Sequence, residues 1–227
     1  RRAINAPRVG LKVIQKWLSS TLGDVYEHHE AVFGFVPGRS AVMAAQKHCG
    51  AHWIINLDIT DFFGSTSVAR ITSGLEAIGY SSAEAKLICR LSTLGGRLPQ
   101  GAPSSPILSN IAFQKCDVKF AELAHSRGLC YTRYADDVTF SGCGETPTDL
   151  IDHFDKVLRK TSWRRAVAKT EVRCRPNQLV VLGLLVNGES PRLPKAYRHR
   201  IRAMRHRLRG GELEDHHRRV LAGHVAY

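Results

Sequence analysis

The sequence has 227 residues, with 33 Lys and Arg against 20 Asp and Glu, and its formal net charge is +13. This length allows one large domain or two small lobes, and the 43% of hydrophobic residues is ordinary for a folded core rather than a disordered chain. No apolar run approaches the roughly 20 residues of a membrane span. We therefore expect a soluble, cytoplasmic protein without a membrane partner. Because the sequence opens on Arg1 rather than Met, we also expect that it begins inside a longer protein or has lost residues at that end.

The first quarter of the chain predicts two helices and a strand. Apolar residues at helical spacing, followed by Gly23, predict the first helix (Leu11, Ile14, Leu18 and Leu22). Ser40 is the expected N-cap of a second helix that runs to about His48. His48, Cys49 and His52 lack a fourth ligand nearby and are expected to mark a helix end rather than a zinc site. Residues 53–59 then alternate in polarity, which is typical of a strand: Ile55, Leu57 and Ile59 on one face and Ile54, Asn56 and Asp58 on the other.

The middle of the chain alternates between helices and strands. Val68, Ile71, Leu75 and Ile78 predict one helix, and Ser81-x-x-Glu84 is the capping box of the next. The Gly- and Pro-rich segment 95–106 leads into a long helix that ends at Gly128. Residues 129–141 predict a hairpin whose turn carries Asp136 and Asp137. A further helix through Phe154 and two strands, over residues 165–174 and 178–186, should follow.

Residues 192–209 hold eight basic and no acidic residues. On a helix, an apolar stripe would lie beside a cationic stripe; the apolar residues are Tyr197, Ile201, Met204 and Leu208, and the cations are Lys195, Arg198, Arg202, Arg205 and Arg209. We expect the apolar stripe to dock on the rest of the fold and the cations to contact nucleic acid phosphates. The alternative is a solvated cationic surface.

Carboxylates follow one strand and sit in the predicted hairpin turn. Asp58 ends the first strand, and Asp136 and Asp137 occur 78 residues later. Mg²⁺ prefers a few carboxylate oxygens together with substrate phosphates, and a pair of metal ions can promote in-line displacement of pyrophosphate. Taken alone, Asp136-Asp137 would more often be a pair that caps a β-turn.

Three segments in this order resemble the palm motifs of reverse transcriptases. They are Asp58-Ile59-Thr60-Asp61-Phe62-Phe63, Leu98-Pro99-Gln100-Gly101-Ala102-Pro103-Ser104-Ser105-Pro106, and Tyr134-Ala135-Asp136-Asp137. The resemblance implies that Asp58, Asp136 and Asp137 are catalytic carboxylates that bind two Mg²⁺ ions, with the backbone carbonyl of Ile59 as a further ligand. It also implies that Asp61 lies near the incoming triphosphate and that Gln100 and Gly101 lie beside the nascent base pair.

The same resemblance assigns further roles. Phe63 is similar to the aromatic gate that excludes a ribose 2′-hydroxyl, and one of Phe62 and Phe63 is expected to be an ordinary core aromatic. Arg2, in a segment similar to the R-x-I-x-x-P of the fingers, would meet the triphosphate or else be solvated. Lys169 would protonate pyrophosphate or simply position phosphate, and residues 180–186 would be a strand that grips the primer end.

Within this family the sequence is most similar to the bacterial retron type. Residues 28–40 resemble retron fingers, and Ala44-Ala45-Gln46-Lys47-His48 resembles the N-A-x-x-H signature with Ala44 in the Asn position. Val181-Leu182-Gly183 stands where retrons carry V-T-G, with Leu182 replacing Thr. These two departures leave other prokaryotic reverse transcriptases, of CRISPR-linked or other defence types, as alternatives.

We therefore predict an α+β right-hand polymerase: an antiparallel palm sheet with helices, helical fingers and the start of a thumb. Residues 1–50 would be partial fingers, 51–186 the palm with a finger insertion around 65–97, and 187–227 the thumb start. The predicted activity is RNA-directed DNA synthesis from dNTPs, retron-type and in anti-phage defence. The expected partners are template RNA, nascent DNA, a cognate structured non-coding RNA and an effector protein. A non-catalytic RNA-binding scaffold and a small metal-dependent nuclease are the competing interpretations.

Overall fold

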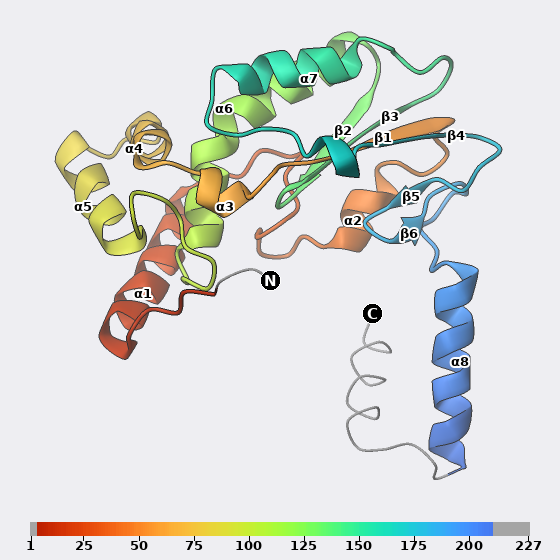
Figure 1. Ribbon diagram of the computed structural model, residues 1–227, viewed down its shortest axis with the longest axis horizontal. Coiled ribbons are helices and arrows are strands. Elements are labelled where there is room, and N and C mark those ends of the chain that lie inside the picture. The colour runs from red at the N-terminus through yellow and green to blue at the C-terminus, as the bar shows by residue number, and fades with distance from the viewer. Residues whose placement is uncertain (1–3, 211–227) are drawn as a thin grey trace.

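The computed structural model describes residues 4–210, which form an α+β fold (Figure 1). Arg2 and residues 211–227, the end of the predicted thumb segment, lie outside the described residues. The helices are α1 (Val9–Val25), α2 (Ala41–Gln46), α3 (Phe62–Ser65), α4 (Val68–Ala77), α5 (Ser82–Ser92), α6 (Ser105–Ser126), α7 (Leu150–Arg159), the 3-10 helix η1 (Val167–Lys169) and α8 (Lys195–Arg209). The strands are β1 (Trp53–Asp58), β2 (Cys130–Tyr134), β3 (Asp137–Gly142), β4 (Glu171–Cys174), β5 (Val180–Val181) and β6 (Leu184–Leu185).

Four antiparallel strands form the central sheet in the order β2-β3-β1-β4. The alternation predicted for β1 is confirmed, because Ile55 and Leu57 join the larger hydrophobic core whereas Ile54 joins a smaller one. Figure 1 shows α6 and α7 over one face of the sheet and α2 with the β5–β6 hairpin against the other. Because both faces of the sheet are covered, the first half of β1 is apolar on both faces. Asn56 and Asp58 are the polar residues of its second half.

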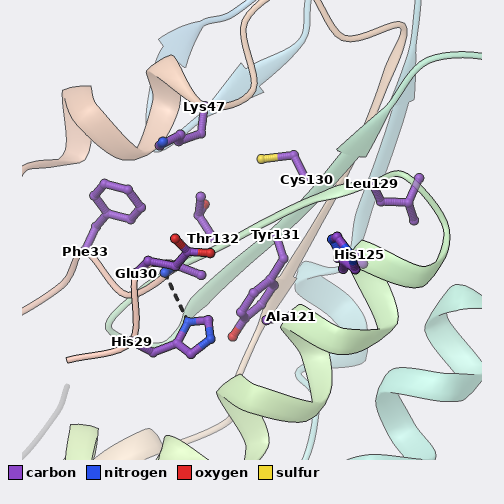
Figure 2. Close-up of a pocket in the computed structure, with 12 residues that line it drawn as sticks. His29, Glu30, Phe33, Lys47, Ala121, His125, Leu129, Cys130, Tyr131 and Thr132 are labelled. Atoms are coloured by element: carbon purple, nitrogen blue, oxygen red, sulfur yellow. Dashed lines mark hydrogen bonds between the residues drawn. The ribbon is translucent and has the colours of Figure 1, made fainter. Parts of the chain in front are cut away.

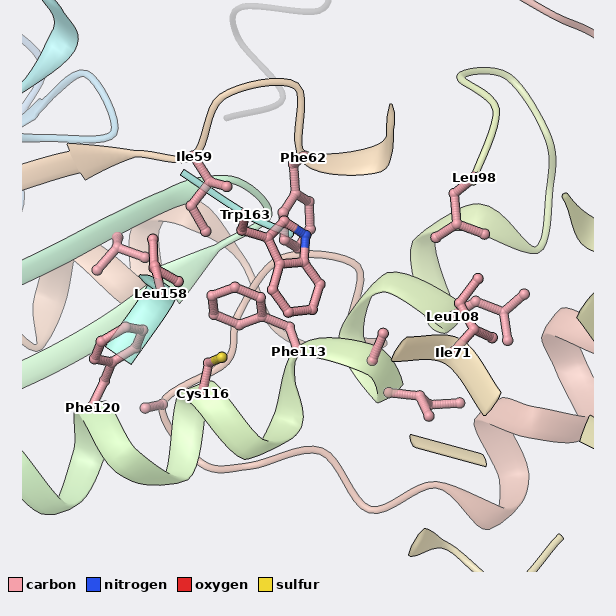
Figure 3. Close-up of a cluster of buried hydrophobic side chains, with 14 of the residues drawn as sticks. Ile59, Phe62, Ile71, Leu98, Leu108, Phe113, Cys116, Phe120, Leu158 and Trp163 are labelled. Carbon is pink, nitrogen blue, oxygen red and sulfur yellow. The ribbon is translucent and has the colours of Figure 1, made fainter. Parts of the chain in front are cut away.

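Helix α6 runs through the larger core and carries much of its aromatic packing (Figure 3). The Phe113 ring lies 4.8 Å from that of Trp163, and the Phe120 ring lies 4.7 Å from that of Phe154. The indole of Trp163 donates a hydrogen bond to Thr66 Oγ1 at 3.1 Å, so its polar edge is satisfied in the core. These contacts fix α3, α6 and α7 relative to the strand ends.

Two predicted helix starts, those capped by a serine side chain, agree with the structure. Ser81 accepts a hydrogen bond from the backbone of Glu84, whose carboxylate accepts one from the backbone of Ser81, so the predicted capping box is confirmed. Ser40 likewise accepts from the Met43 backbone at the start of α2. His48 is buried between Ser141 Oγ and Thr132 Oγ1, each 2.7 Å away, which explains its place beside a helix end without a metal.

Both late strands differ from their predicted form. The predicted strand 165–174 is strand only from Glu171, because Lys169 N donates to Ala166 O and closes the 3-10 turn η1. The predicted single strand 178–186 is a tight hairpin of β5 and β6. Leu182 and Gly183, with φ of 50° and 80°, form its two-residue turn.

Helix α8 is observed where the sequence predicts it, but its docking is not. Figure 1 shows α8 extending away from the sheet beyond the β5–β6 hairpin, and none of its residues is buried. The predicted docking of the apolar stripe on the rest of the fold is therefore wrong within residues 4–210. An amphipathic pattern indicates that a helix has an apolar side, but it does not say what covers that side. None of the described helices is long and apolar enough to cross a membrane.

Candidate active site

Backbone pairing brings the three predicted carboxylates to one end of the sheet. Asp58, the last residue of β1, is directly opposite Asp137, the first residue of β3. The backbone N–H of Ile59 donates to the carbonyl of Asp136 at 3.1 Å, which ties the end of β1 to the hairpin turn. Asp58, Asp136 and Asp137 line one cavity of about 590 Å³, together with Lys169, Leu182 and Gly183. The side chain of Ile59 is buried in the core, so only its main chain lies at this site.

The turn that carries Asp136 depends on a close backbone contact. Ala135 has a left-handed backbone, with φ of 58°. A Cβ at Gly34 would lie 2.1 Å from the backbone N of Ala135, so only glycine fits beneath the turn. On the other side, Arg133 Nη1 donates to Ala135 O at 3.0 Å. The aspartate turn is therefore held by two segments that are distant from each other in sequence.

Arg133 is itself fixed by a buried ion pair. Its guanidinium donates two hydrogen bonds of 2.7 Å to the carboxylate of Asp117 on α6, and both side chains are fully buried. Two further hydrogen bonds extend the network, since Asn110 Oδ1 accepts from Arg133 at 3.1 Å and Tyr131 donates to Asp117 Oδ1 at 2.7 Å. Sequence reasoning missed this network, because nothing in the sequence distinguishes these two charges from surface ones.

The electrostatics of the site favour a bound cation. Lys169 Nζ donates to Asp58 Oδ2 at 2.7 Å, and this ammonium reaches Asp58 because η1 turns the chain there. Burial, reinforced by the negative charges of Asp136 and Asp58, raises the pKa of Asp137 to about 6, and Lys169 opposes this shift. Mutual repulsion among carboxylates is what a multivalent cation relieves.

The donor set fits magnesium in its chemistry, because carboxylate oxygens and a main-chain carbonyl are all hard oxygen ligands. Within residues 4–210, however, no three His, Cys, Asp or Glu side chains converge into a ready-made coordination shell. Asp58 is instead engaged by Lys169. The three carboxylates could hold the ion only after their side chains shift toward it.

A second cavity, of about 360 Å³, adjoins the carboxylates on the side of the fingers-like segments. Asp136, Phe63, Phe35, Gln100 and Gly101 line it with three further residues. Figure 3 shows Phe62 pointing into the core towards Trp163 and Phe113, whereas Phe63 is only partly buried. Sequence reasoning did not single out Phe35, and nothing in the sequence alone places it here.

Asp61 faces a different cavity from Asp136. It has a left-handed backbone, with φ of 43°, and lies at the start of α3. It lines a cavity of about 320 Å³ with Arg97, Gln100 and Asn5, and Gln100 also lines the cavity beside Phe63. The predicted nucleotide residues Asp61, Phe63, Gln100 and Gly101 are therefore spread over two neighbouring cavities.

A family model described as "Reverse transcriptase (RNA-dependent DNA polymerase)" matches residues 1–186. The chain belongs to the reverse transcriptase family. It is 33% identical to the Retron Mx65 reverse transcriptase of Myxococcus xanthus, with 100% of this chain and 57% of that protein covered. It is 36% identical to the Retron Ec86 reverse transcriptase of Escherichia coli, over 62% of this chain and 44% of that protein.

Among solved structures, the telomerase of Candida albicans matches with a TM-score of 0.59 and 14% identity, over 82% of this chain and 38% of that one. This reverse transcriptase chain therefore has the right-hand polymerase fold, as the sequence predicts. It spans about half the length of the curated retron relatives named above.

The cationic stripe of this reverse transcriptase chain is not gathered at the carboxylates. Every member of the stripe is exposed on α8, which Figure 1 places on the far side of the β5–β6 hairpin: Lys195, Arg198, Arg202, Arg205 and Arg209. The hairpin itself lies between them and the carboxylate end of the sheet, because Leu182 and Gly183 line the carboxylate cavity.

A cavity elsewhere in the chain is distinct from both sites. Figure 2 shows this space of about 250 Å³ beside strand β2, with Lys47, His125 and Cys130 on its walls. His29 in the same wall accepts a hydrogen bond from the Ala31 backbone at 3.2 Å. Burial raises the pKa of the Cys130 thiol to about 11, so little of it is in the nucleophilic thiolate form at neutral pH.

Proposed function

We propose that this chain is the polymerase portion of a retron-type enzyme that copies a structured non-coding RNA into DNA. The observation that carries the proposal is the placement of Asp58, Asp136 and Asp137 in one cavity, next to a second cavity walled by Phe63 and Gln100. Clustered negative charge beside nucleic acid would hinder a pure binding module, and this disfavours the non-catalytic scaffold. A nuclease would have no use for the Phe63 pocket.

In this proposal, Asp58, Asp136 and Asp137 hold two magnesium ions, with the Ile59 carbonyl as a further ligand. The bound metal would supply charge neutralisation for the attacking hydroxyl and the leaving pyrophosphate. The sheet would keep the carboxylates in register during the reaction, because Asp58 and Asp137 are paired through the backbone ladder. Lys169, already within hydrogen-bond distance of Asp58, would release that carboxylate and either protonate or position the pyrophosphate.

The second cavity would receive the incoming dNTP. Phe63 would exclude a 2′-hydroxyl, and Gln100 and Gly101 would lie beside the new base pair. Asp61 would lie on the triphosphate side, in the neighbouring cavity that shares Gln100. We also propose the predicted division of the chain: fingers over 1–50 and around 65–97, palm over 51–186 and the thumb from 187.

The retron assignment is supported by the similar retron enzymes, whereas two local departures from the retron signatures argue against it. Ala44 replaces the signature Asn, and Leu182 replaces the Thr of V-T-G, at the turn of the β5–β6 hairpin. Template and primer would be a structured non-coding RNA with an effector protein as partner in anti-phage defence. Another prokaryotic defence-type or CRISPR-linked reverse transcriptase is the second candidate, favoured by these two departures.

Primer extension with labelled dNTPs on an RNA template tests the activity. The protein should extend in Mg²⁺, and Asp136→Asn should lose on the order of a thousandfold in rate, since several kcal/mol of transition-state stabilisation are removed. RNA binding and thermal unfolding should remain close to wild type. Wild-type extension by Asp136→Asn would refute the assignment, and a branched RNA–DNA molecule bound to the purified protein would identify the retron type.

A further inference from the structure

Phe35 lies in the cavity beside Phe63 although the proposed chemistry gives it no role. Its ring stacks on that of Phe63, with centroids 5.7 Å apart and planes 29° from parallel. Both rings line the same space with Asp136 and Gln100. The Phe62 ring is only tilted relative to that of Phe63, with centroids 6.0 Å apart. Phe35 is therefore the one stacked aromatic neighbour of Phe63 within residues 4–210.

The backbone at Phe35 is unusual for an aromatic residue. Its φ is 62°, in the left-handed region that Gly and Asn adopt far more readily than a bulky side chain. The residue is also 40% exposed, so core burial does not explain its presence. Backbone strain at a cavity wall is typical of a functional site, and here it directs an aromatic ring onto Phe63.

The segment that carries Phe35 is held firmly on both sides. Gly34 packs against the Ala135 backbone, and its carbonyl accepts a hydrogen bond from Asn110 Nδ2 at 3.0 Å. Arg39, which follows Phe35, donates through Nη1 to the carbonyls of His29 and Val32, which precede it, at 2.7 and 2.6 Å. The Phe35 ring therefore stands on a backbone that cannot easily withdraw from Phe63.

We propose that Phe35 is a specificity-determining residue that holds the Phe63 ring in place against the sugar of the incoming nucleotide. This inference rests on the proposed polymerase function. A steric gate excludes a 2′-hydroxyl only if its ring cannot move aside, and a ring with one free face can rotate or tilt. Stacking by Phe35 removes that freedom, so discrimination belongs to the pair of rings rather than to Phe63 alone.

The test compares kcat/KM for a dNTP and for the ribonucleotide of the same base in primer extension. Phe35→Asn removes the ring while suiting the left-handed backbone, and Phe35→Tyr retains the stack as a matched control. We expect the ratio of kcat/KM for the dNTP to kcat/KM for the ribonucleotide to fall on the order of tenfold in Phe35→Asn, which matches the interaction energy of an aromatic pair. In Phe35→Tyr the ratio should stay within about twofold of the wild-type value. The fall should come mainly from faster use of the ribonucleotide.

A double-mutant cycle with Phe63→Val locates the effect. If Phe35 acts through Phe63, adding Phe35→Asn to Phe63→Val should lower the ratio no further. An unchanged ratio in Phe35→Asn, or equal losses for both nucleotides, would overturn the inference while leaving the polymerase proposal intact. A fully additive fall would also overturn it, because Phe35 would then act independently. A wild-type protein that adds neither nucleotide would overturn both proposals.

Discussion

Single residues set the geometry of the candidate active site through their backbones as much as through their side chains. That Asp58, Asp136 and Asp137 lie close together could be predicted from the sequence, because their motifs are local and ordered. The role of Gly34 could not, because it contacts Ala135 from a distant part of the chain. Arg133 is only two residues from Ala135, but its burial and its pairing with Asp117 on α6 could not be predicted from the sequence. Phe62 and Phe63 are a similar case. The sequence cannot say which of two adjacent phenylalanines is buried in the core, and the structure buries Phe62.

Gly34→Ala should distort the turn that carries Asp136. The added methyl group would overlap the backbone N of Ala135, so either the turn or the 31–35 segment must move. We expect at least a hundredfold loss of nucleotide addition and about 1–3 kcal/mol of lost stability, the usual cost of overpacking. Chemical denaturation and primer extension measure the two effects. Gly10→Ala is the matched control, because nothing lies within 4 Å of that site, and normal activity in Gly34→Ala would disprove the close fit.

His48 should make the folded state sensitive to mild acid. Burial lowers its pKa to about 3, well below the ordinary value of 6.5 that it regains on unfolding. Between these values the unfolded chain binds more protons. The contribution of His48 to the free energy of unfolding should therefore be fully present above about pH 6.5. Below that pH, the free energy of unfolding should decrease by up to about 1.4 kcal/mol per pH unit.

Urea denaturation from pH 7.5 to 5 checks this, with His48→Gln as the comparison. The glutamine amide can hydrogen-bond Ser141 or Thr132 but does not titrate in this range. The stability advantage of the wild type over His48→Gln should shrink as the pH falls. A constant difference would mean that His48 does not titrate on unfolding.

At the scale of elements, regular patterns were readable and exceptions to them were not. The alternation of β1 and the capping box of α5 agree with the structure because each reflects contacts within a few residues. The β5–β6 hairpin was missed because its turn places Leu182, a residue that seldom adopts a positive φ, at a hairpin position. The apolar stripe correctly predicted the helix α8. It did not predict that this helix lies apart from the rest of the described fold.

Helix α8 offers a direct test of nucleic acid binding. Replacing Arg198, Arg202 and Arg205 together by Gln should weaken binding to an RNA–DNA duplex of any sequence. If each contacts a phosphate, the slope of log affinity against log salt should decrease by about one unit per lost contact. The fold should survive, since all three are exposed.

The matched control removes the same charge elsewhere, by changing exposed Lys86, Arg90 and Arg159 to Gln. That variant should keep the wild-type salt slope if α8 is the contact surface. Equal effects of the two triple variants would show that net charge alone, rather than α8, governs binding. A loss confined to one RNA sequence would indicate specific recognition instead.

For the molecule as a whole, the Arg133–Asp117 pair links the long helix α6, the sheet and the aspartate turn. Asp117→Asn would leave the buried guanidinium without its counter-charge. We expect about 3–5 kcal/mol of lost stability, as is usual when one partner of a buried pair is removed.

Asp149→Asn is the control, because its bidentate pair with Arg127 lies at the surface and should contribute little to stability. Denaturation of both variants under the same conditions gives the comparison. Similar losses in the two variants would mean that the buried network is not a major source of stability.

The uninterrupted pairing of β1 with β3, from Trp53 opposite Gly142 to Asp58 opposite Asp137, has a consequence for insertions and deletions. Asp58 and Asp137 lie opposite each other only because the number of residues in each strand keeps this register. One residue added within β3 would turn Asp137 to the opposite face of the sheet, whereas residues added beyond Gly142 would leave it in place. Length variation in such enzymes should therefore accumulate in the connection that follows Gly142 and be absent between Asp137 and Gly142.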